Sequence, residues 1–327
     1  MAKIGIMSFA HMHAFSYAAC LNALPEAELA GIWDDDAKRG KAMAKEFNTK
    51  FTASLDKFLA GDMDGVIICS ENVKHRAMVE AAAKAGKWIL CEKPLAPTVK
   101  EAKEMVALCK KAGVGLGTAF PCRFAPTLIE ARAQIQSGAL GNILAIACTN
   151  NGQCPFGWFV DEKLAGGGAT MDHTVHVADA LRWMLDKEFT KVYCENGNLL
   201  HKKEIKTDDL GMLNLEMEGG IQVSHIASWS RSKSFPTWGD VTMEFIGTKG
   251  VLNVDAFNQK VNVFNDATMR HTWASYGDNP DLGLVLDFVN AVDEKIEPSV
   301  TGLDGLRATE VTVAACKSAK SRKMEKI

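Results

Sequence analysis

The chain has 327 residues, a length that suits two domains better than one core. Hydrophobic residues make up 47% and charged residues 24%, as in ordinary globular proteins. The net charge is −3 without a long basic run, which argues against nucleic-acid binding. No apolar run is long enough to span a bilayer, and the N-terminus lacks a signal-peptide pattern. Nine cysteines without a C-x-x-C pair predict neither a disulfide framework nor a metal finger, and favour a cytoplasmic location.

The first third of the chain alternates short apolar runs with helical patterns. Strands are expected at 4–7, 28–33, 65–69, 88–91 and 114–118, and helices at 14–24, 36–47, 55–59, 74–85 and 99–111. Strands that alternate with helices form right-handed βαβ units. We therefore predict that residues 1–120 form an α/β domain with a parallel sheet.

The pattern changes after residue 120. Helices are expected at 126–137, 168–185, 282–295 and 303–318, and strands at 143–148, 192–195, 209–217, 221–228, 241–247, 250–255 and 260–265. Gly219 and Gly220 lie between two of these strands and predict a hairpin turn. Residues 121–327 are therefore predicted to form an α+β domain with an open, mainly antiparallel sheet.

The turn after the first strand is where dinucleotide-binding folds place a G-x-G-x-x-G loop around a pyrophosphate. Serine, alanine and histidine occupy the three glycine positions in Ser8-Phe9-Ala10-His11-Met12-His13. The small side chains of Ser8 and Ala10 permit a modified turn over a phosphate. Two alternatives stay open for each histidine: it packs within the turn, or it reaches phosphate or substrate. The glycine-rich segment 113–117 is expected to be a helix C-cap followed by a strand.

Asp34 ends the second predicted strand, 21 residues after His13. This is the position of the acid that binds the ribose hydroxyls of a dinucleotide. A carboxylate there repels a 2′-phosphate by a few kcal/mol at about 4 Å, which favours NAD over NADP. Lys38 and Arg39 lie close by and soften that preference, so NADP stays possible. The alternative is that Asp34 is a turn or helix-cap acid.

Lys93 follows the fourth predicted strand in the run Cys91-Glu92-Lys93-Pro94. Open α/β sheets bind ligands at the carboxyl ends of their strands. Pro94 ends the strand and fixes the turn, because it has no N–H and a fixed φ. The run therefore predicts an amine at the mouth of a cleft. The alternative is an exposed lysine in a loop.

A second group of polar residues lies in the segment 166–179, where a glycine turn opens a helix. Asp172 and His176 are four residues apart and share one helix face. Asp179 follows three residues later, where it can orient the imidazole. An acid–histidine pair of this kind suits general-base chemistry. His173 is expected to point away from that face. Because no third ligand is obvious, we expect no bound metal.

Together these residues resemble the Gfo/Idh/MocA family (glucose–fructose oxidoreductase, inositol dehydrogenase, rhizopine catabolism) over almost the whole chain. The Glu92-Lys93-Pro94 run is similar to the most specific motif of that family, and the glycine triplet with Asp172 and His176 matches its catalytic helix. The missing glycine fingerprint is a departure. The other matching positions are Ser70, Asn72 and His75 after the third strand, Arg123-Phe124-Ala125-Pro126, Trp158 and the run 302–306.

The resemblance implies NAD(P)-dependent hydride transfer at a carbinol carbon of a sugar, polyol or sugar derivative. It implies a catalytic group of Lys93, Asp172 and His176, in which His176 takes the hydroxyl proton. The cofactor residues that follow from it are Ser8, Phe9, Ala10, His11, His13, Asp34, Arg39, Ser70, Asn72, His75, Glu92 and Lys93. The substrate residues are Lys93, Arg123, Trp158, Asp172 and His176.

Two other functions stay open beside a dehydrogenase. One is a redox-neutral enzyme that keeps its NAD and epimerises, eliminates or cleaves a glycoside through a keto intermediate. The other is a regulator that binds a dinucleotide without catalysis, against which the Lys93, Asp172 and His176 set argues. The resemblance also implies a homodimer or homotetramer formed through the C-terminal sheet, and the alternating apolar positions of 241–263 are expected at that contact.

Overall fold

The computed structural model describes residues 1–275 and 277–327, which form two compact units. The first unit contains residues 1–121, 163–165 and 281–309. The second contains 122–162, the described part of 166–280, and 310–327. The sequence analysis had assigned 163–165 and 281–309 to the second domain. Within the described ranges, the helices are all too short or too polar to cross a membrane.

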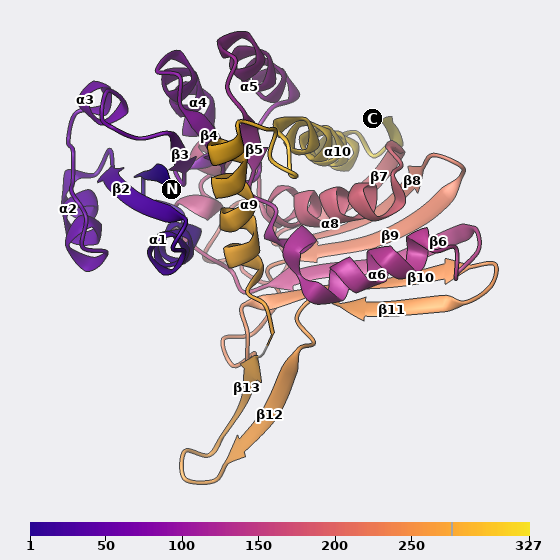
Figure 1. Ribbon diagram of the computed structural model, residues 1–327. Coiled ribbons are helices and arrows are strands. Elements are labelled where there is room, and N and C mark those ends of the chain that lie inside the picture. The colour runs from indigo at the N-terminus through magenta and orange to yellow at the C-terminus, as the bar shows by residue number, and fades with distance from the viewer. Residues whose placement is uncertain (276) are drawn as a thin grey trace. The chain divides into compact units, whose positions relative to one another are not determined.

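The first unit is built on a parallel sheet with the strand order β2-β1-β3-β4-β5 (Figure 1). Its strands are β1 (Ala2–Met7), β2 (Ala27–Trp33), β3 (Gly65–Ile68), β4 (Trp88–Cys91) and β5 (Leu116–Thr118). The connections are α1 (His13–Ala23), α2 (Ala37–Glu46), α3 (Leu55–Leu59), the 3-10 turn η1 (Asn72–Lys74), α4 (His75–Lys84) and α5 (Val99–Ala112). From residue 281 on, α9 (Pro280–Glu294) belongs to this unit, as does α10 (Gly302–Ser321) up to residue 309. The predicted parallel α/β sheet is confirmed.

The register of this sheet brings four strand ends to one edge. Met7 pairs with Trp33 on one side and with Ile68 on the other, and Ile68 pairs with Cys91. The chain adds β2 on one side of β1 and then β3, β4 and β5 on the other side. The boundary between β1 and β3 is therefore the switch point where such sheets bind ligands. The residues that follow Met7, Trp33, Ile68 and Cys91 therefore lie along one edge of the sheet.

Packing in the first unit follows from the apolar pattern of its elements. All four residues of β3 are buried, as expected for a strand covered on both faces. The buried face of α4 is formed by His75, Met78, Val79, Ala82 and Ala83, at helical spacing. Helix α5 ends at Gly113, whose φ of 70° is left-handed. The prediction that Gly113 is a helix C-cap is confirmed.

The second unit is a mixed sheet with the order β11-β10-β6-β9-β8-β7-β14, in which β6 and β9 are parallel and the other pairs antiparallel. Its strands are β6 (Ile143–Gly152), β7 (Phe189–Gly197), β8 (Leu210–Met217), β9 (Ile221–Ser228), β10 (Gly239–Gly247), β11 (Val251–Asp255) and β14 (Glu325–Lys326). Its helices include α6 (Pro126–Gln136), α7 (Glu162–Ala165, of which residue 162 belongs here) and α8 (Ala169–Leu185). Its 3-10 turns are η2 (Pro121–Phe124, from residue 122 on) and η3 (Gly157–Val160). Met217 pairs with Ile221, which confirms the predicted hairpin.

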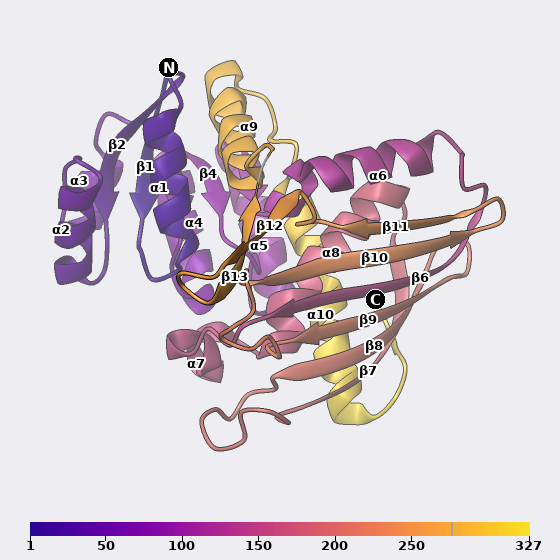
Figure 2. The same ribbon diagram turned by 90° about the horizontal axis from the view of Figure 1, so that it is seen from below.

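One face of this sheet is covered and the other is open. Figures 1 and 2 show α6 and α8 on the covered face. In β8 the residues Leu213, Leu215 and Met217 are buried there, whereas Met212 and Asn214, which alternate with them, are exposed. This alternation is that of an antiparallel sheet with one free face.

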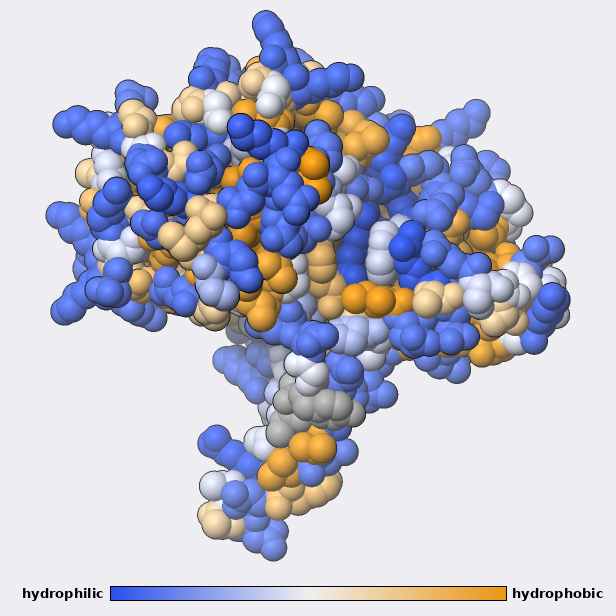
Figure 3. All heavy atoms as spheres, in the orientation of Figure 1, coloured by the Kyte–Doolittle hydropathy of each residue, from blue (hydrophilic) through white to orange (hydrophobic). Residues whose placement is uncertain are grey.

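A separate hairpin joins β12 (Lys260–Asn265) to β13 (Arg270–Ser275). It extends from the sheet and carries exposed apolar side chains, among them Phe264 and Met269 (Figures 1 and 3). The strand β13 was missed, because its residues do not alternate between apolar and polar and its pairing with β12 defines it. The short elements α7 and β14 were missed as well.

His225 in β9 makes the stability of the second unit depend on pH. It is 2% exposed, and burial, helped by the nearby His173, lowers the pKa of His225 to about 3. Because the unfolded chain protonates histidine at about pH 6.5, stability is full above that pH and is lost as the pH falls toward 3. Between pH 7.5 and 5 we expect a loss of about 2 kcal/mol in the free energy of unfolding. Urea titrations should show it.

The variant His225→Leu removes the titrating group and should flatten this pH dependence by about 2 kcal/mol. The same change at His271, which is exposed in the β12–β13 hairpin, serves as the control for the loss of a histidine outside the core. Equal pH slopes for the wild type and His225→Leu would refute the assignment.

Candidate active site

The turn after β1 keeps the shape of a phosphate loop without its glycines. Ser8 takes a φ of 73°, the left-handed conformation in which glycine is usual, and its N–H donates to the carbonyl of Trp33 over 2.7 Å. The following N–H groups have protein acceptors: Phe9 donates to Asp34 Oδ2 (2.8 Å), Ala10 to Ser8 Oγ (3.2 Å), His11 to the Cys69 carbonyl (2.9 Å) and His13 to His11 Nδ1 (3.2 Å). Three of these acceptors are side-chain atoms, and rotation of the Ser8 or His11 side chain would release an N–H for a ligand.

Asp34, at the end of β2, is bound on both carboxylate oxygens. Arg39 Nε and Nη2 donate to Oδ2 and Oδ1 over 2.8 and 2.7 Å, and the N–H of Asp36 donates to Oδ1 over 2.8 Å. The hydrogen bond and the charge of Asp34 raise the pKa of Arg39 although burial opposes it. Asp36 caps α2 by accepting the N–H groups of Lys38 and Arg39. The alternative that Asp34 caps α2 is therefore wrong, although Asp34 does stabilise the turn before that helix.

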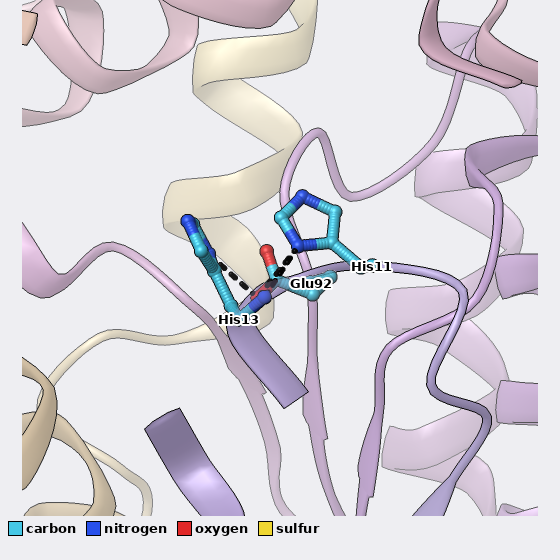
Figure 4. A group of neighbouring side chains, drawn as sticks. All are labelled: His11, His13 and Glu92. Atoms are coloured by element: carbon cyan, nitrogen blue, oxygen red, sulfur yellow. Dashed lines mark hydrogen bonds and ion pairs between the residues drawn. The ribbon is translucent and has the colours of Figure 1, made fainter. Parts of the chain in front are cut away.

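His11, His13 and Glu92 converge above the ends of β1 and β4 (Figure 4). Glu92 Oε1 lies 3.0 Å from His13 Nδ1 and 3.8 Å from His11 Nδ1. Burial by itself would raise the pKa of Glu92, but the charges of His11, His13 and Lys93 hold it well below its usual range. Burial likewise opposes protonation of His13, yet the Glu92 carboxylate outweighs it and raises the pKa of His13. The sequence analysis named these residues separately and did not predict that they meet.

Lys93 belongs to a buried loop. It is 5% exposed, so the alternative of an exposed loop lysine is wrong, and its N–H donates to Glu92 Oε2 over 3.0 Å. The loop is held by His75, whose Nδ1 faces the carbonyls of Pro94 (3.1 Å) and Leu95 (3.2 Å). The Lys93–Pro94 peptide is cis.

His75 was predicted to contact the cofactor, but both nitrogens of its ring face carbonyl groups of the protein. The residue has no exposed surface, and its Nε2 faces the carbonyl of Ser70 over 3.2 Å. Burial lowers the pKa of His75. It therefore joins the loop after β3 to the loop after β4 and positions both. Ser70 and Asn72 are also buried in this region, and Asn72 Nδ2 donates to the carbonyl of Ala165 over 2.8 Å.

In the second unit, α8 presents Asp172 and His176 on one face. Between residues 169 and 181 these are the two that keep partial exposure, and all others are buried. Trp229 Nε1 donates to Asp172 Oδ2 over 3.1 Å, and His173 Nε2 lies 3.3 Å from the same oxygen. His173 is buried, and its contact with the Asp172 carboxylate was not predicted. His173 Nδ1 lies 2.8 Å from the carbonyl of Asn150, which fixes the ring.

The start of α8 depends on an aspartate that the sequence analysis missed. Asp208 Oδ2 accepts both the N–H (2.8 Å) and the hydroxyl (2.6 Å) of Thr170. A Cβ on Gly168 would lie 2.2 Å from the Asp208 carbonyl oxygen, so glycine is required there. Burial raises the pKa of Asp208, which the hydrogen bonds from Thr170 partly offset. No local sequence signal connects residues 168 and 208.

Arg123 and Asp179 form a buried bidentate ion pair in the second unit. Arg123 Nε and Nη2 donate to Asp179 Oδ2 and Oδ1 over 2.8 and 2.5 Å, and the side chains are 8% and 0% exposed. Both carboxylate oxygens of Asp179, expected to orient His176, are thus engaged by Arg123. Arg123 was expected to bind substrate, and this pair gives it a structural role. Trp158 is half-buried and stacks on Phe159 at 3.9 Å between ring centroids.

Comparison with known families decides the identity of the chain. Residues 2–120 match the oxidoreductase family with an NAD-binding Rossmann fold, Gfo/Idh/MocA, and residues 128–253 match a C-terminal domain of the same family. The chain belongs to the Gfo/Idh/MocA family. The predicted family, fold class and NAD cofactor class are confirmed.

Gfo/Idh/MocA relatives align over most of their length. The chain is 29% identical to a 1,5-anhydro-D-fructose reductase of Ensifer adhaerens, over 89% of each protein. It is 25% identical to a myo-inositol 2-dehydrogenase of Thermotoga maritima, over 99% of this chain and 98% of the relative. It is 27% identical to a 2,7-anhydro-N-acetylneuraminate hydratase of Escherichia coli, over 78% of this chain and 68% of the relative. The crystal structure of GenD2 from gentamicin A biosynthesis, in complex with NAD, has the same fold, with a TM-score of 0.90 at 24% identity, over 100% of this chain and 96% of GenD2.

Proposed function

We propose that this Gfo/Idh/MocA oxidoreductase is an NAD-dependent dehydrogenase that oxidises a carbinol carbon of a sugar, polyol or sugar derivative. The main support is α8, where Asp172 and His176 stay partly exposed on one face of an otherwise buried helix. The names of the reductase and inositol dehydrogenase relatives support the substrate class. Screening sugars and polyols for NADH formation tests the proposal, and no turnover of any of them would count against it.

The proposed mechanism uses three side chains. Bound NAD supplies the hydride acceptor. The family resemblance implies that His176 takes the proton of the substrate hydroxyl and that the Lys93 ammonium polarises the same oxygen. Asp172 is fixed by Trp229 and His173. In this proposal it holds the substrate hydroxyl and the His176 imidazole in place. Positioned acid–base catalysis of this kind contributes on the order of 10²–10⁴ in rate.

The residues of the first unit fit a dinucleotide with a modified phosphate turn. Ser8 supplies the left-handed turn that glycine usually supplies. Helix α1 has no acidic residue in its first turn, so its N-terminus suits an anion. Rotation of the Ser8 and His11 side chains would open the N–H groups of Ala10 and His13 to a phosphate. Asp34 next to the turn favours NAD over NADP.

One relative favours a second candidate function. The Escherichia coli relative is named as a hydratase, and the addition of water is a reaction without net oxidation. This name supports a redox-neutral enzyme with retained NAD. Substrate consumption without accumulation of NADH, by protein purified with NAD bound, would establish this alternative. Steady NADH formation would exclude it.

We further propose a cytoplasmic homodimer or homotetramer that assembles through the open sheet face. Met212, Ile246 and Val251 are exposed in the strands of that sheet, and residues 241–263 include the last two. The nine cysteines are free thiols, as expected in a reducing compartment. Light scattering of the purified chain should give a mass of two or four copies, and a monomer at micromolar concentration would refute the assembly.

A further inference from the structure

Two imidazoles and a carboxylate meet at the sheet edge of the first unit (Figure 4). We propose that His11, His13 and Glu92 form a binding site for a divalent transition-metal cation of the zinc class. The sequence analysis expected no metal, because it weighed the cysteines and the Asp172 and His176 pair but not these three residues together. This inference does not rest on the proposed dehydrogenase activity.

The spacing of the three side chains suits such a cation. One ligand atom from each residue lies within 4.8 Å of the other two, and the two imidazole–carboxylate distances are 3.0 and 3.8 Å. Zinc bonds of about 2.0–2.2 Å in a tetrahedral site place neighbouring ligand atoms about 3.3–3.5 Å apart. Shifts of about an ångström or less in side-chain position, with release of the His13 N–H that His11 Nδ1 accepts, would therefore complete the geometry.

The donor set is that of an open metal site. Two histidine nitrogens and one glutamate oxygen bind zinc in enzymes that keep a fourth position for water or substrate. Such donors also exclude magnesium and calcium, which prefer oxygen ligands. The side chains of His11 and Glu92 are 2% and 0% exposed, whereas that of His13 is 30% exposed. A cation would therefore enter past His13.

The surrounding residues already orient the ligands. The Lys93 N–H donates to Glu92 Oε2, which leaves Oε1 directed at the imidazoles. The His11 N–H donates to the Cys69 carbonyl, and the two imidazole rings lie 4.3 Å apart between centroids. Outer contacts of this kind fix the direction of a metal ligand. The positive charge of Lys93 opposes a second cation nearby, so we expect moderate rather than extreme affinity.

The test is calorimetric titration of the untagged full chain, freed of metal and NAD, with Zn²⁺. We expect one equivalent bound with a dissociation constant of about 10 μM or tighter. Co²⁺ in its place should give the visible absorption of a four-coordinate site. Zn²⁺ affinity should fall by at least about 10–100-fold in His13→Gln and in Glu92→Gln, because even outer contacts of metal ligands have effects of that size.

Two controls locate the ion. His271→Gln removes an exposed histidine from the β12–β13 hairpin, and His176→Ala removes the histidine of α8. Both should bind Zn²⁺ as the wild type does. Absence of binding by the wild type, or equal loss in a control and in His13→Gln, would overturn the proposal. If Glu92→Gln does not fold, the Zn²⁺ affinity of His13→Gln decides, because the His13 side chain is partly exposed. Because NAD is absent, failure here leaves the dehydrogenase proposal standing.

Discussion

Replacing His176 with alanine should lower kcat/KM for NAD reduction by about 10²–10⁴-fold, the usual contribution of a positioned general base. The side chain lies on the partly exposed face of α8, one helical turn after Asp172, while its neighbours in the helix are buried. Removing a half-buried imidazole leaves those packed positions unchanged. Steady-state assays with the substrate found by screening will measure the loss.

Two further measurements separate loss of the base from loss of structure. NAD affinity and the unfolding temperature should stay close to those of the wild type in His176→Ala, and added imidazole should restore part of its rate. His271→Ala, the same change at an exposed position, should have wild-type kinetics. Undiminished activity of His176→Ala would end the assignment of His176 as the base.

Local patterns were sufficient for most elements of the fold. The expected bounds of α3, β4, β9 and β12 are those of the structure, because turn residues and apolar runs mark both ends of each. The extension of β6 to Gly152 was not predicted. Its last residues, Asn150 and Asn151, are buried polar side chains that bond to Asp240 of the neighbouring strand. Pairing of that kind has no signature in a single stretch of sequence.

The site was predictable as separate residues rather than as contacts. His13 and Glu92 were each recognised, yet β3 lies between β1 and β4 in the sheet, and only the register shows that their ends reach the same edge. His75 and Arg123 show the converse. Both match positions expected to touch ligands, but burial and protein partners occupy their polar atoms. Which partner a polar side chain finds is decided by tertiary packing.

Replacing Asp34 with serine should shift cofactor preference toward NADP by about 10–100-fold, or about 1.4–2.7 kcal/mol. The Asp34 carboxylate accepts four hydrogen bonds, two from Arg39 and one each from the N–H groups of Phe9 and Asp36. A carboxylate has about four accepting sites, so a ribose hydroxyl must displace one of these donors. Arg39 is the donor able to move, because its side chain is 31% exposed and the other two are backbone groups.

Removal of the carboxylate leaves the Arg39 guanidinium without its main partner and deletes the charge that repels a 2′-phosphate. Guanidinium binds phosphate through paired hydrogen bonds, so Arg39 should then recognise NADP. Calorimetric titration with both cofactors measures the shift. Asp35→Ser is the matched control, since Asp35 also lies 3.1 Å from Arg39 but does not end β2. The double change Asp34→Ser/Arg39→Ala should lose the gained NADP affinity. If it keeps that affinity, relief of repulsion alone explains the shift, and Arg39 does not select the cofactor.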